Sequence, residues 1–323
     1  MRPTGFYLHP AAARHDTGWR HPEHQGRLRA LVSRVEKEML SFHERVVQHD
    51  APEAVEEDLL RVHTPEHVDR VREAVERARA SEEIVSLDAD TRVSAASWEA
   101  AVGSAGAAIA ACRDVADGEI ANAFVATRPP GHHATPDRAM GFCLFNNVAV
   151  AARWLQAEGR SERVLIVDWD VHHGNGTQDV FWEDPDVFYW SLHQSPHYPG
   201  TGAAEETGSG PGAGATLNVP LRPGTSGEEY RRAFTSALDE VRGRFEPDFV
   251  LVSSGFDVLA GDPLGGQRLE PEDLHAMTRE LLEWGEEAWG GRLAVLLEGG
   301  YVPERLGEGA VAVIRALAGL GAG

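Results

Sequence analysis

The chain has 323 residues, of which 42% are hydrophobic and 25% charged, a composition typical of a globular protein with a large core. Its 30 Lys and Arg against 51 Asp and Glu give a formal net charge of −21, which argues against nucleic acid as a partner and favours cationic substrates. No apolar run reaches the roughly 18 residues that a membrane-spanning helix needs, and the only cysteines, Cys112 and Cys143, are too few for a disulfide framework, so we expect a cytoplasmic protein.

Apolar, strand-like runs alternate with helical patterns along the whole chain. The predicted strands cover residues 4–9, 46–47, 122–126, 164–167, 187–193, 248–253 and 293–297. The predicted helices cover residues 27–40, 63–80, 95–115, 148–158, 224–244, 271–288 and 307–320. The Gly-rich stretch 196–214 reads as a loop, and its length suggests that it borders a functional site. This alternation predicts one α/β domain over residues 1–323, with a mostly parallel central sheet and helices on both faces.

The stretch 164–178, VLIVDWDVHHGNGTQ, carries the strongest chemical signal. A buried strand runs into Asp168, Asp170 and His172, and in an extended chain side chains two residues apart point to the same side. Ligands bind at the carboxyl ends of strands in open α/β sheets, and two carboxylates with an imidazole suit a divalent metal. Such residues can also be loop residues or helix caps, but the repeated spacing favours a metal or catalytic site.

Three further predicted strands end in polar motifs, namely GHH at 131–133, SGFD at 254–257 and EGGY at 298–301. Parallel strands bring these ends to one edge of the sheet, so we expect them to converge. Asp257 is the best partner for Asp170 and His172, although it could instead cap a turn. Three protein ligands leave a position for water, as in hydrolytic zinc sites, and iron or cobalt would also fit this set.

The adjacent histidines His132 and His133 could be structural, but nearby residues offer each a partner. Asp168 can orient His132 and favour its charged form, whereas Asn175 can hold His133 without adding charge. His133 would then be free to take up and return a proton. Tyr301, after two glycines, could donate a hydrogen bond to a developing oxyanion, although a GGY turn alone is weak evidence.

Together these motifs resemble the histone deacetylase superfamily, with its arginase/deacetylase fold, and the bacterial and archaeal acetoin-utilisation-like deacetylases in particular. The matching segments are RHPEHQGR (20–27), RPPGHHA (128–134), GFCLFNN (141–147), DWDVHHGNGTQ (168–178), SLH (191–193), PGTG (199–202), SSGFDVLAGDPLGG (253–266) and EGGY (298–301). Asn175 resembles class II members, and Tyr301 resembles the active enzymes. Leu264 resembles protein deacetylases, whereas polyamine-selective relatives often carry Glu there.

The resemblance implies a catalytic zinc ion that activates water for attack on an amide carbonyl. The implied zinc ligands are Asp170, His172 and Asp257. It further implies His133 as general base and then general acid, His132 as an electrostatic aid, and Tyr301 as the donor to the oxyanion.

The resemblance also implies a substrate channel and structural potassium. The channel would accept an acyl-lysine side chain between Gly141, Phe142, Tyr198 and Leu264, with His197 as an alternative to Tyr198 for the second aromatic wall. The potassium ligands would be oxygens of Asp168, Asp170, His172, Ser191 and Leu192. A second monovalent site is expected near Phe181, Asp184 and Val187.

The leading hypothesis is therefore a zinc-dependent amidohydrolase that removes acetyl or other acyl groups from Nε-acyl-lysine in proteins or peptides. A second hypothesis is the same chemistry on a small N-acyl amine such as an acetylpolyamine, which the acidic charge supports and Leu264 opposes. A third is a non-catalytic acyl-binding regulatory protein, against which the complete set of site residues argues. The sequence does not indicate an oligomeric state.

Overall fold

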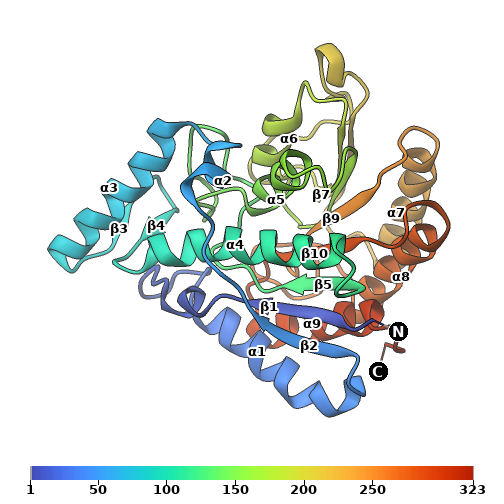
Figure 1. Cartoon of the computed structure of the whole chain (residues 1–323), viewed down its shortest axis with the longest axis horizontal. Coiled ribbons are helices and arrows are strands. Elements are labelled where there is room, and N and C mark those ends of the chain that lie inside the picture. The colour runs from blue at the N-terminus through green and yellow to red at the C-terminus, as the bar shows by residue number, and fades with distance from the viewer. Residues whose placement is uncertain (1, 323) are drawn as a thin grey trace.

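An eight-stranded parallel sheet forms the centre of the computed structural model, which describes residues 2–322 apart from the side chain of Glu287. Its strand order is β2-β1-β5-β10-β9-β6-β7-β8, and every neighbouring pair is parallel (Figure 1). The strands are β1 (Thr4–Leu8), β2 (Val46–Asp50), β5 (Asn122–Val125), β6 (Val164–Asp168), β7 (Val187–Gln194), β8 (Thr216–Leu221), β9 (Phe249–Ser254) and β10 (Leu293–Leu297). A separate antiparallel hairpin consists of β3 (Val85–Ser86) and β4 (Arg92–Val93).

Helices cover both faces of the sheet. They are α1 (Gly26–Glu38), α2 (Glu56–Leu60), α3 (Pro65–Ser81), α4 (Ser97–Ala116), α5 (Asn147–Ala157), α6 (Asn175–Phe181), α7 (Gly227–Arg242), α8 (Pro271–Ala288) and α9 (Pro303–Leu317). Apolar residues of α1, α7, α8 and α9 belong to one core cluster, and those of α3, α4 and α5 belong to the other. The central strands supply both clusters, because Val250 and Val252 of β9 face one side while Phe249 and Leu251 face the other.

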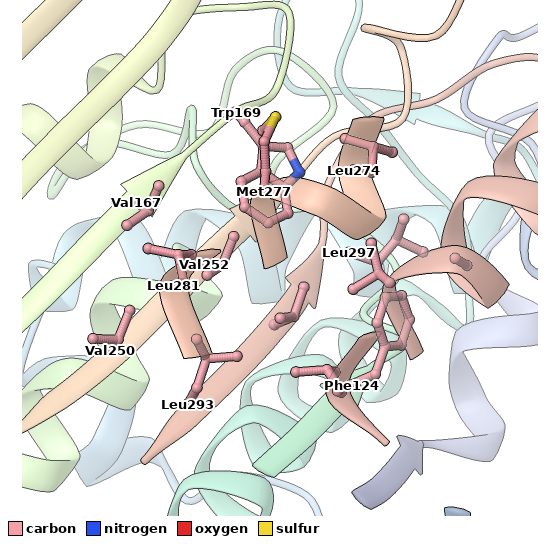
Figure 2. Packing of buried hydrophobic residues seen from close by; sticks show 14 of the residues in the cluster. Phe124, Val167, Trp169, Val250, Val252, Leu274, Met277, Leu281, Leu293 and Leu297 are labelled. Carbon is pink, nitrogen blue, oxygen red and sulfur yellow. The ribbon is translucent and has the colours of Figure 1, made fainter. Parts of the chain in front are cut away.

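Figure 2 shows part of the first cluster, where α8 lies against the sheet. Leu274, Met277 and Leu281 follow one another along a single face of α8 and pack against strand residues such as Val252 and Leu293. All five side chains are at most 1% exposed. Since burial of one such side chain stabilises the fold by about 1.5–3 kcal/mol, this packing fixes α8 against the central strands that lead to the site.

The predicted fold class is confirmed, and most element boundaries agree within a few residues. The structure adds β8, α6 and the β3–β4 hairpin, which the sequence pattern did not reveal. Pro220 lies within β8, and it is tolerated because β8 is an edge strand that pairs only with β7. α6 has seven residues and begins with Asn and Gly, so it offers too little apolar periodicity to recognise.

In the part of the chain that the structure describes, we find no helix with both the length and the apolar character needed to cross a membrane.

Candidate active site

The carboxyl ends of β5, β10, β9 and β6 lie next to one another at one edge of the sheet. Register explains this convergence, because Asp168 at the end of β6 pairs with Ser253 of β9, and Leu297 of β10 pairs with Ser254. The polar motifs that follow these strands therefore meet, as the sequence predicts.

Asp170, His172 and Asp257 form a cluster in which one ligand atom from each residue lies within 4.8 Å of the others. Nδ1 of His172 is 2.9 Å from Oδ1 of Asp170 and 3.4 Å from Oδ2 of Asp257. Both carboxylates are completely buried, and no described residue donates a hydrogen bond to Oδ2 of Asp257. Two buried carboxylates, one of them with an unpaired oxygen, and an imidazole make a donor set that fits a divalent metal ion.

The electrostatics of this cluster also favour a bound cation. Burial and the negative charge of Asp170 raise the pKa of Asp257 to about 7. Burial alone would lower the pKa of His172, but its contacts with Asp170 and Asp257 outweigh that effect and raise it to about 10. Without a metal, His172 therefore stays protonated beside the two carboxylates. A bound metal ion would supply this positive charge in place of the proton.

Glycines give the two carboxylates the space they occupy. A Cβ on Gly255 would collide with Asp170, and a Cβ on Gly299 would collide with both carboxylates. The backbone N–H of Gly299 instead donates a 2.8 Å hydrogen bond to Oδ2 of Asp170, and that of Val171 donates a 3.0 Å bond to Oδ1 of Asp257. Any larger residue at Gly255 or Gly299 would displace the cluster.

The two adjacent histidines have different partners. Nδ1 of His132 is 3.0 Å from Oδ2 of Asp168, and Nδ1 of His133 is 2.9 Å from Oδ1 of Asn175. Burial opposes charge on His132, but Asp168 and Asp170 raise its pKa to about 10. Burial, followed by repulsion from His132 and His172, lowers the pKa of His133 well below its usual value. At neutral pH the first ring is therefore cationic and the second neutral.

A cavity of about 450 Å³ opens beside these histidines. Its lining includes all four residues that the sequence assigns to a channel, namely Gly141, Phe142, Tyr198 and Leu264. His133, His172, His197 and Tyr301 also line it, so both candidates for the second aromatic wall are present. Among the lining residues that the sequence did not single out are Asp90 and Gln194.

Phe142 and Tyr198 are held in the cavity wall by specific contacts. Phe142 adopts a left-handed backbone conformation (φ 70°), and its N–H donates to Oγ1 of Thr91 at 3.0 Å. Its ring meets that of Tyr301 edge-on, with centroids 5.8 Å apart. The Tyr198 ring lies edge-on to His133 at 5.1 Å, and the side chain is 38% exposed, so Tyr198 also faces the outside.

An arginine on α1 supports the turn that carries Tyr301, and sequence reasoning assigned it no role although it lies in the matching segment RHPEHQGR (20–27). Arg27 is wholly buried and donates hydrogen bonds of 2.6 Å to the carbonyl oxygens of Glu298 and Gly300. Its guanidinium carbon lies 4.9 Å from the centroid of the Tyr301 ring. Glu23, also fully buried, pairs with both Arg27 and Arg128. The available signals were the four-residue spacing of Glu23 and Arg27 and their place in that matching segment.

Glu298 is a second residue that sequence reasoning missed. Its buried carboxylate accepts hydrogen bonds from the backbone N–H groups of Gly131 (2.7 Å) and His132 (3.2 Å) and from the hydroxyl of Ser253 (3.1 Å). Burial raises its pKa to about 7. This carboxylate thus ties the ends of β5, β9 and β10 together. An acidic residue directly after a buried apolar strand was the signal.

The residues expected to hold potassium lie on neighbouring strands. Asp168 of β6 pairs in register with Ser191 of β7, and Leu192 follows directly. The carbonyl oxygen of Leu192 accepts a 3.1 Å hydrogen bond from the Tyr230 hydroxyl. At the second expected site the Asp184 carboxylate pairs with Arg153, which leaves mainly backbone oxygens for a cation.

Comparisons with known proteins agree with this geometry. The model of the histone deacetylase domain matches residues 21–317. A histone deacetylase-like amidohydrolase of Pseudomonas aeruginosa is 40% identical over 317 residues, which cover 98% of this chain and 80% of that protein. A probable deacetylase of Archaeoglobus fulgidus is 38% identical over 301 residues, covering 93% of this chain and 82% of that protein. The crystal structure of the HDA15 HD domain matches with a TM-score of 0.92 and 39% identity, covering 100% of this chain and 90% of that chain. The chain therefore belongs to the histone deacetylase family of hydrolases.

Proposed function

We propose that this protein is a zinc-dependent deacylase that removes acetyl or other acyl groups from Nε-acyl-lysine in proteins or peptides. One observation supports the proposal: buried Asp170, His172 and Asp257 each offer a ligand atom within 4.8 Å of the others, beside a cavity that His133 lines, and Oδ2 of Asp257 accepts no hydrogen bond from a described residue. Iron or cobalt is an alternative to zinc, because the same donor set accepts several divalent ions.

When bound by Asp170, His172 and Asp257, zinc would polarise the amide carbonyl and lower the pKa of a water molecule. His133 is suited to the proton transfers. With Nδ1–H donated to Asn175, its Nε2 carries the free lone pair, and its lowered pKa keeps that lone pair available at neutral pH. The same Nε2 can return the proton to the departing lysine amine.

His132 and Tyr301 would stabilise negative charge that develops on the substrate. The cationic His132, held by Asp168, lies 4.0 Å from His133 between ring centroids, so its charge acts at short range. The Tyr301 hydroxyl would donate to the oxyanion, and Arg27 fixes the turn from which Tyr301 projects.

The cavity walls would select the substrate side chain. The rings of Phe142 and Tyr198 offer two apolar surfaces for the methylene stem of lysine, and Leu264 supplies no carboxylate for a second amine. A structural potassium ion held by the Asp168 and Ser191 region would brace β6 and β7 beneath the triad. The alternative substrate, a small N-acyl amine, is supported by the net charge of −21 and by Asp90 in the cavity lining.

Turnover by the metal-loaded protein tests the proposal. An acetyl-lysine peptide, peptides with longer acyl chains and acetylspermidine would be compared, with Asp170→Ala as the control. We expect peptide hydrolysis that disappears in the variant, with circular dichroism confirming that the variant remains folded. Preference for acetylspermidine would favour the alternative. No turnover of any substrate with metal bound would contradict catalysis and support an acyl-binding role.

A further inference from the structure

A highly exposed tryptophan stands next to the wall of the cavity. Trp19 is 88% exposed. Two residues later, the His21 ring meets the Phe142 ring edge-on, with centroids 4.8 Å apart. Because consecutive Cα atoms are about 3.8 Å apart, the Cα atoms of Trp19 and His21 are at most about 7.6 Å apart. Trp19 therefore belongs to the same short segment as a residue that packs against the cavity wall.

Hydrogen bonds fix the position of the turn that presents Trp19. The N–H of His21 donates to the carbonyl of Gly18 at 3.3 Å, and the Thr17 hydroxyl donates to the carbonyl of Glu23 at 2.7 Å. A ring nitrogen of His21 is 2.9 Å from the carbonyl oxygen of Asp90, which lines the cavity. The indole is thus exposed on a tied segment, so little chain ordering would oppose its contacts with a ligand.

A second exposed apolar side chain extends the surface. Ile84 is 38% exposed, and a Cβ placed on Gly18 would lie only 3.0 Å from its Cδ1 atom. We call Trp19 and Ile84 the mouth shelf. The chain near these two residues is mostly acidic, with the exposed Asp16, Glu82 and Glu83 and the partly buried Asp88 and Asp90, whereas Arg20 follows Trp19 and Nη1 of Arg92 donates to the carbonyl of Thr17 at 3.3 Å.

We propose that the mouth shelf binds the residues that flank the acyl-lysine in a peptide or protein substrate, with a preference for apolar and basic flanking residues. The inference rests on the proposed deacylase function and names its substrate class. With the acyl-lysine in the cavity, the substrate backbone stays at the mouth, and an extended chain advances about 3.3 Å per residue. Residues two or three positions away thus extend about 7–10 Å over the surface around the mouth, where the segment that carries Trp19 packs against Phe142 through His21.

The chemistry of the shelf matches such a substrate. Tryptophan is enriched among residues that dominate binding at protein interfaces, and the acidic surroundings complement basic neighbours of an acyl-lysine. A small N-acyl amine such as acetylspermidine can extend an aminopropyl chain beyond a lysine-length stem, but it has no flanking apolar side chain to contact Trp19. The shelf therefore favours peptide substrates over small acylated amines.

Kinetics on two substrates test the inference. One is a peptide of about seven residues whose acetyl-lysine is flanked by leucine and arginine, and the other is N-acetylated Nε-acetyl-lysine methylamide. We expect Trp19→Ala to raise KM for the peptide about tenfold and to change kcat/KM for the small substrate less than about twofold. Equal losses on both substrates, or no loss on either, would overturn the inference.

Leu40→Ala is the matched control. Leu40 is 93% exposed and follows α1, about 20 Å along the helix from Arg27, so its removal should affect neither substrate. Binding of the fluorescently labelled peptide separates the two proposals. If the peptide binds more weakly to Trp19→Ala but the native protein does not hydrolyse it, the proposed catalysis is contradicted and the mouth shelf is not. Binding that is equally tight in Trp19→Ala overturns the shelf, whether or not turnover occurs.

Discussion

At the scale of single residues, the neighbouring groups give His132 and His133 different charge states although the two side chains are identical. His132 faces the carboxylates of Asp168 and Asp170, whereas His133 faces the amide of Asn175 and the cationic His132. Burial, followed by the charges of His132 and His172, lowers the pKa of His133, and an amide at position 175, unlike a carboxylate, adds no negative charge to oppose them.

Replacing Asn175 with Asp tests this dependence with a nearly isosteric change. The added negative charge would favour the protonated form of His133 and raise its pKa. We expect the acid limb of the kcat/KM profile to move to higher pH, so that activity below pH 7 falls most. A profile whose acid limb keeps its position would show that His133 does not govern it.

Replacing Tyr301 with Phe removes one hydroxyl and leaves the ring packed against Phe142 and Arg27. We expect kcat to fall by about 10²–10³, the usual effect of losing one oxyanion donor, with little change in thermal stability. The measurement is kcat at saturating substrate. A loss of only a few-fold would assign the oxyanion to another donor.

The sequence could predict these candidate residues because their motifs follow the ends of recognisable strands. It could not identify Arg27 or Glu298, because both act on backbone groups that lie far away in the chain. Arg27 donates to the carbonyl of Gly300, 273 residues later, and Glu298 accepts from the N–H of Gly131, 167 residues earlier. Local spacing contains no information about such partners.

At the scale of elements, the loop 195–214 forms part of the cavity and projects in yellow at the top of Figure 1. Glu206 anchors it by accepting hydrogen bonds from the backbone N–H groups of Gly202 and Ala203, both 3.1 Å, and from Nε2 of Gln178 at 2.7 Å. Gln178 belongs to α6, the helix that also carries Asn175. One carboxylate thus connects the Tyr198 wall with the helix that orients His133.

Replacing Glu206 with Ala would remove all three hydrogen bonds and free the loop. We expect KM for an acyl-lysine peptide to rise several-fold, because the Tyr198 wall loses its fixed position, and kcat to change less. Limited proteolysis should cut the loop faster. Glu206→Gln is the control, because its amide oxygen can keep two of the three bonds. A variant with an unchanged KM would mean that other contacts hold the loop.

The sequence predicted this loop by its glycines but not its anchor, and it did not predict β8 directly after it. Both depend on contacts formed only in the fold: Glu206 with α6, and β8 with the edge of the sheet beside β7. By contrast, the central strands were predictable because burial on both faces requires continuous apolar runs.

At the scale of the whole molecule, buried histidines couple stability to pH. Burial lowers the pKa values of one group of histidines to about 3 or 4, so these stay neutral in the folded state. They are His15, His63, His173 and His193. Below pH 6.5 these histidines bind protons in the unfolded chain but remain neutral in the folded protein. The free energy of unfolding therefore falls as the pH falls.

His132 and His172 act in the opposite sense. Their pKa values are raised to about 10, so the folded protein keeps two protons that the unfolded chain releases above pH 6.5, and stability falls as the pH rises towards 10. Asp257 and Glu298, raised to about 7, favour the folded state at low pH and partly offset the acid loss. Because the histidines with lowered pKa values favour unfolding in acid and those with raised pKa values favour it in alkali, the metal-free protein should be most stable near neutral pH.

Thermal unfolding from pH 4 to 10, with chelator and with zinc, measures how the stability of the protein depends on pH and on bound metal. We expect the Tm of the chelated protein to peak near pH 7 and fall on both sides. Zinc at a thousand times its Kd should add about 4 kcal/mol to the free energy of unfolding. The stabilisation by zinc should grow above pH 7, because a zinc ion held by Asp170, His172 and Asp257 would replace the proton that the metal-free site must otherwise retain. A chelated Tm that keeps rising from pH 7 to 9 would contradict the raised pKa values of His132 and His172, and zinc stabilisation that persists in Asp170→Ala would place the metal elsewhere.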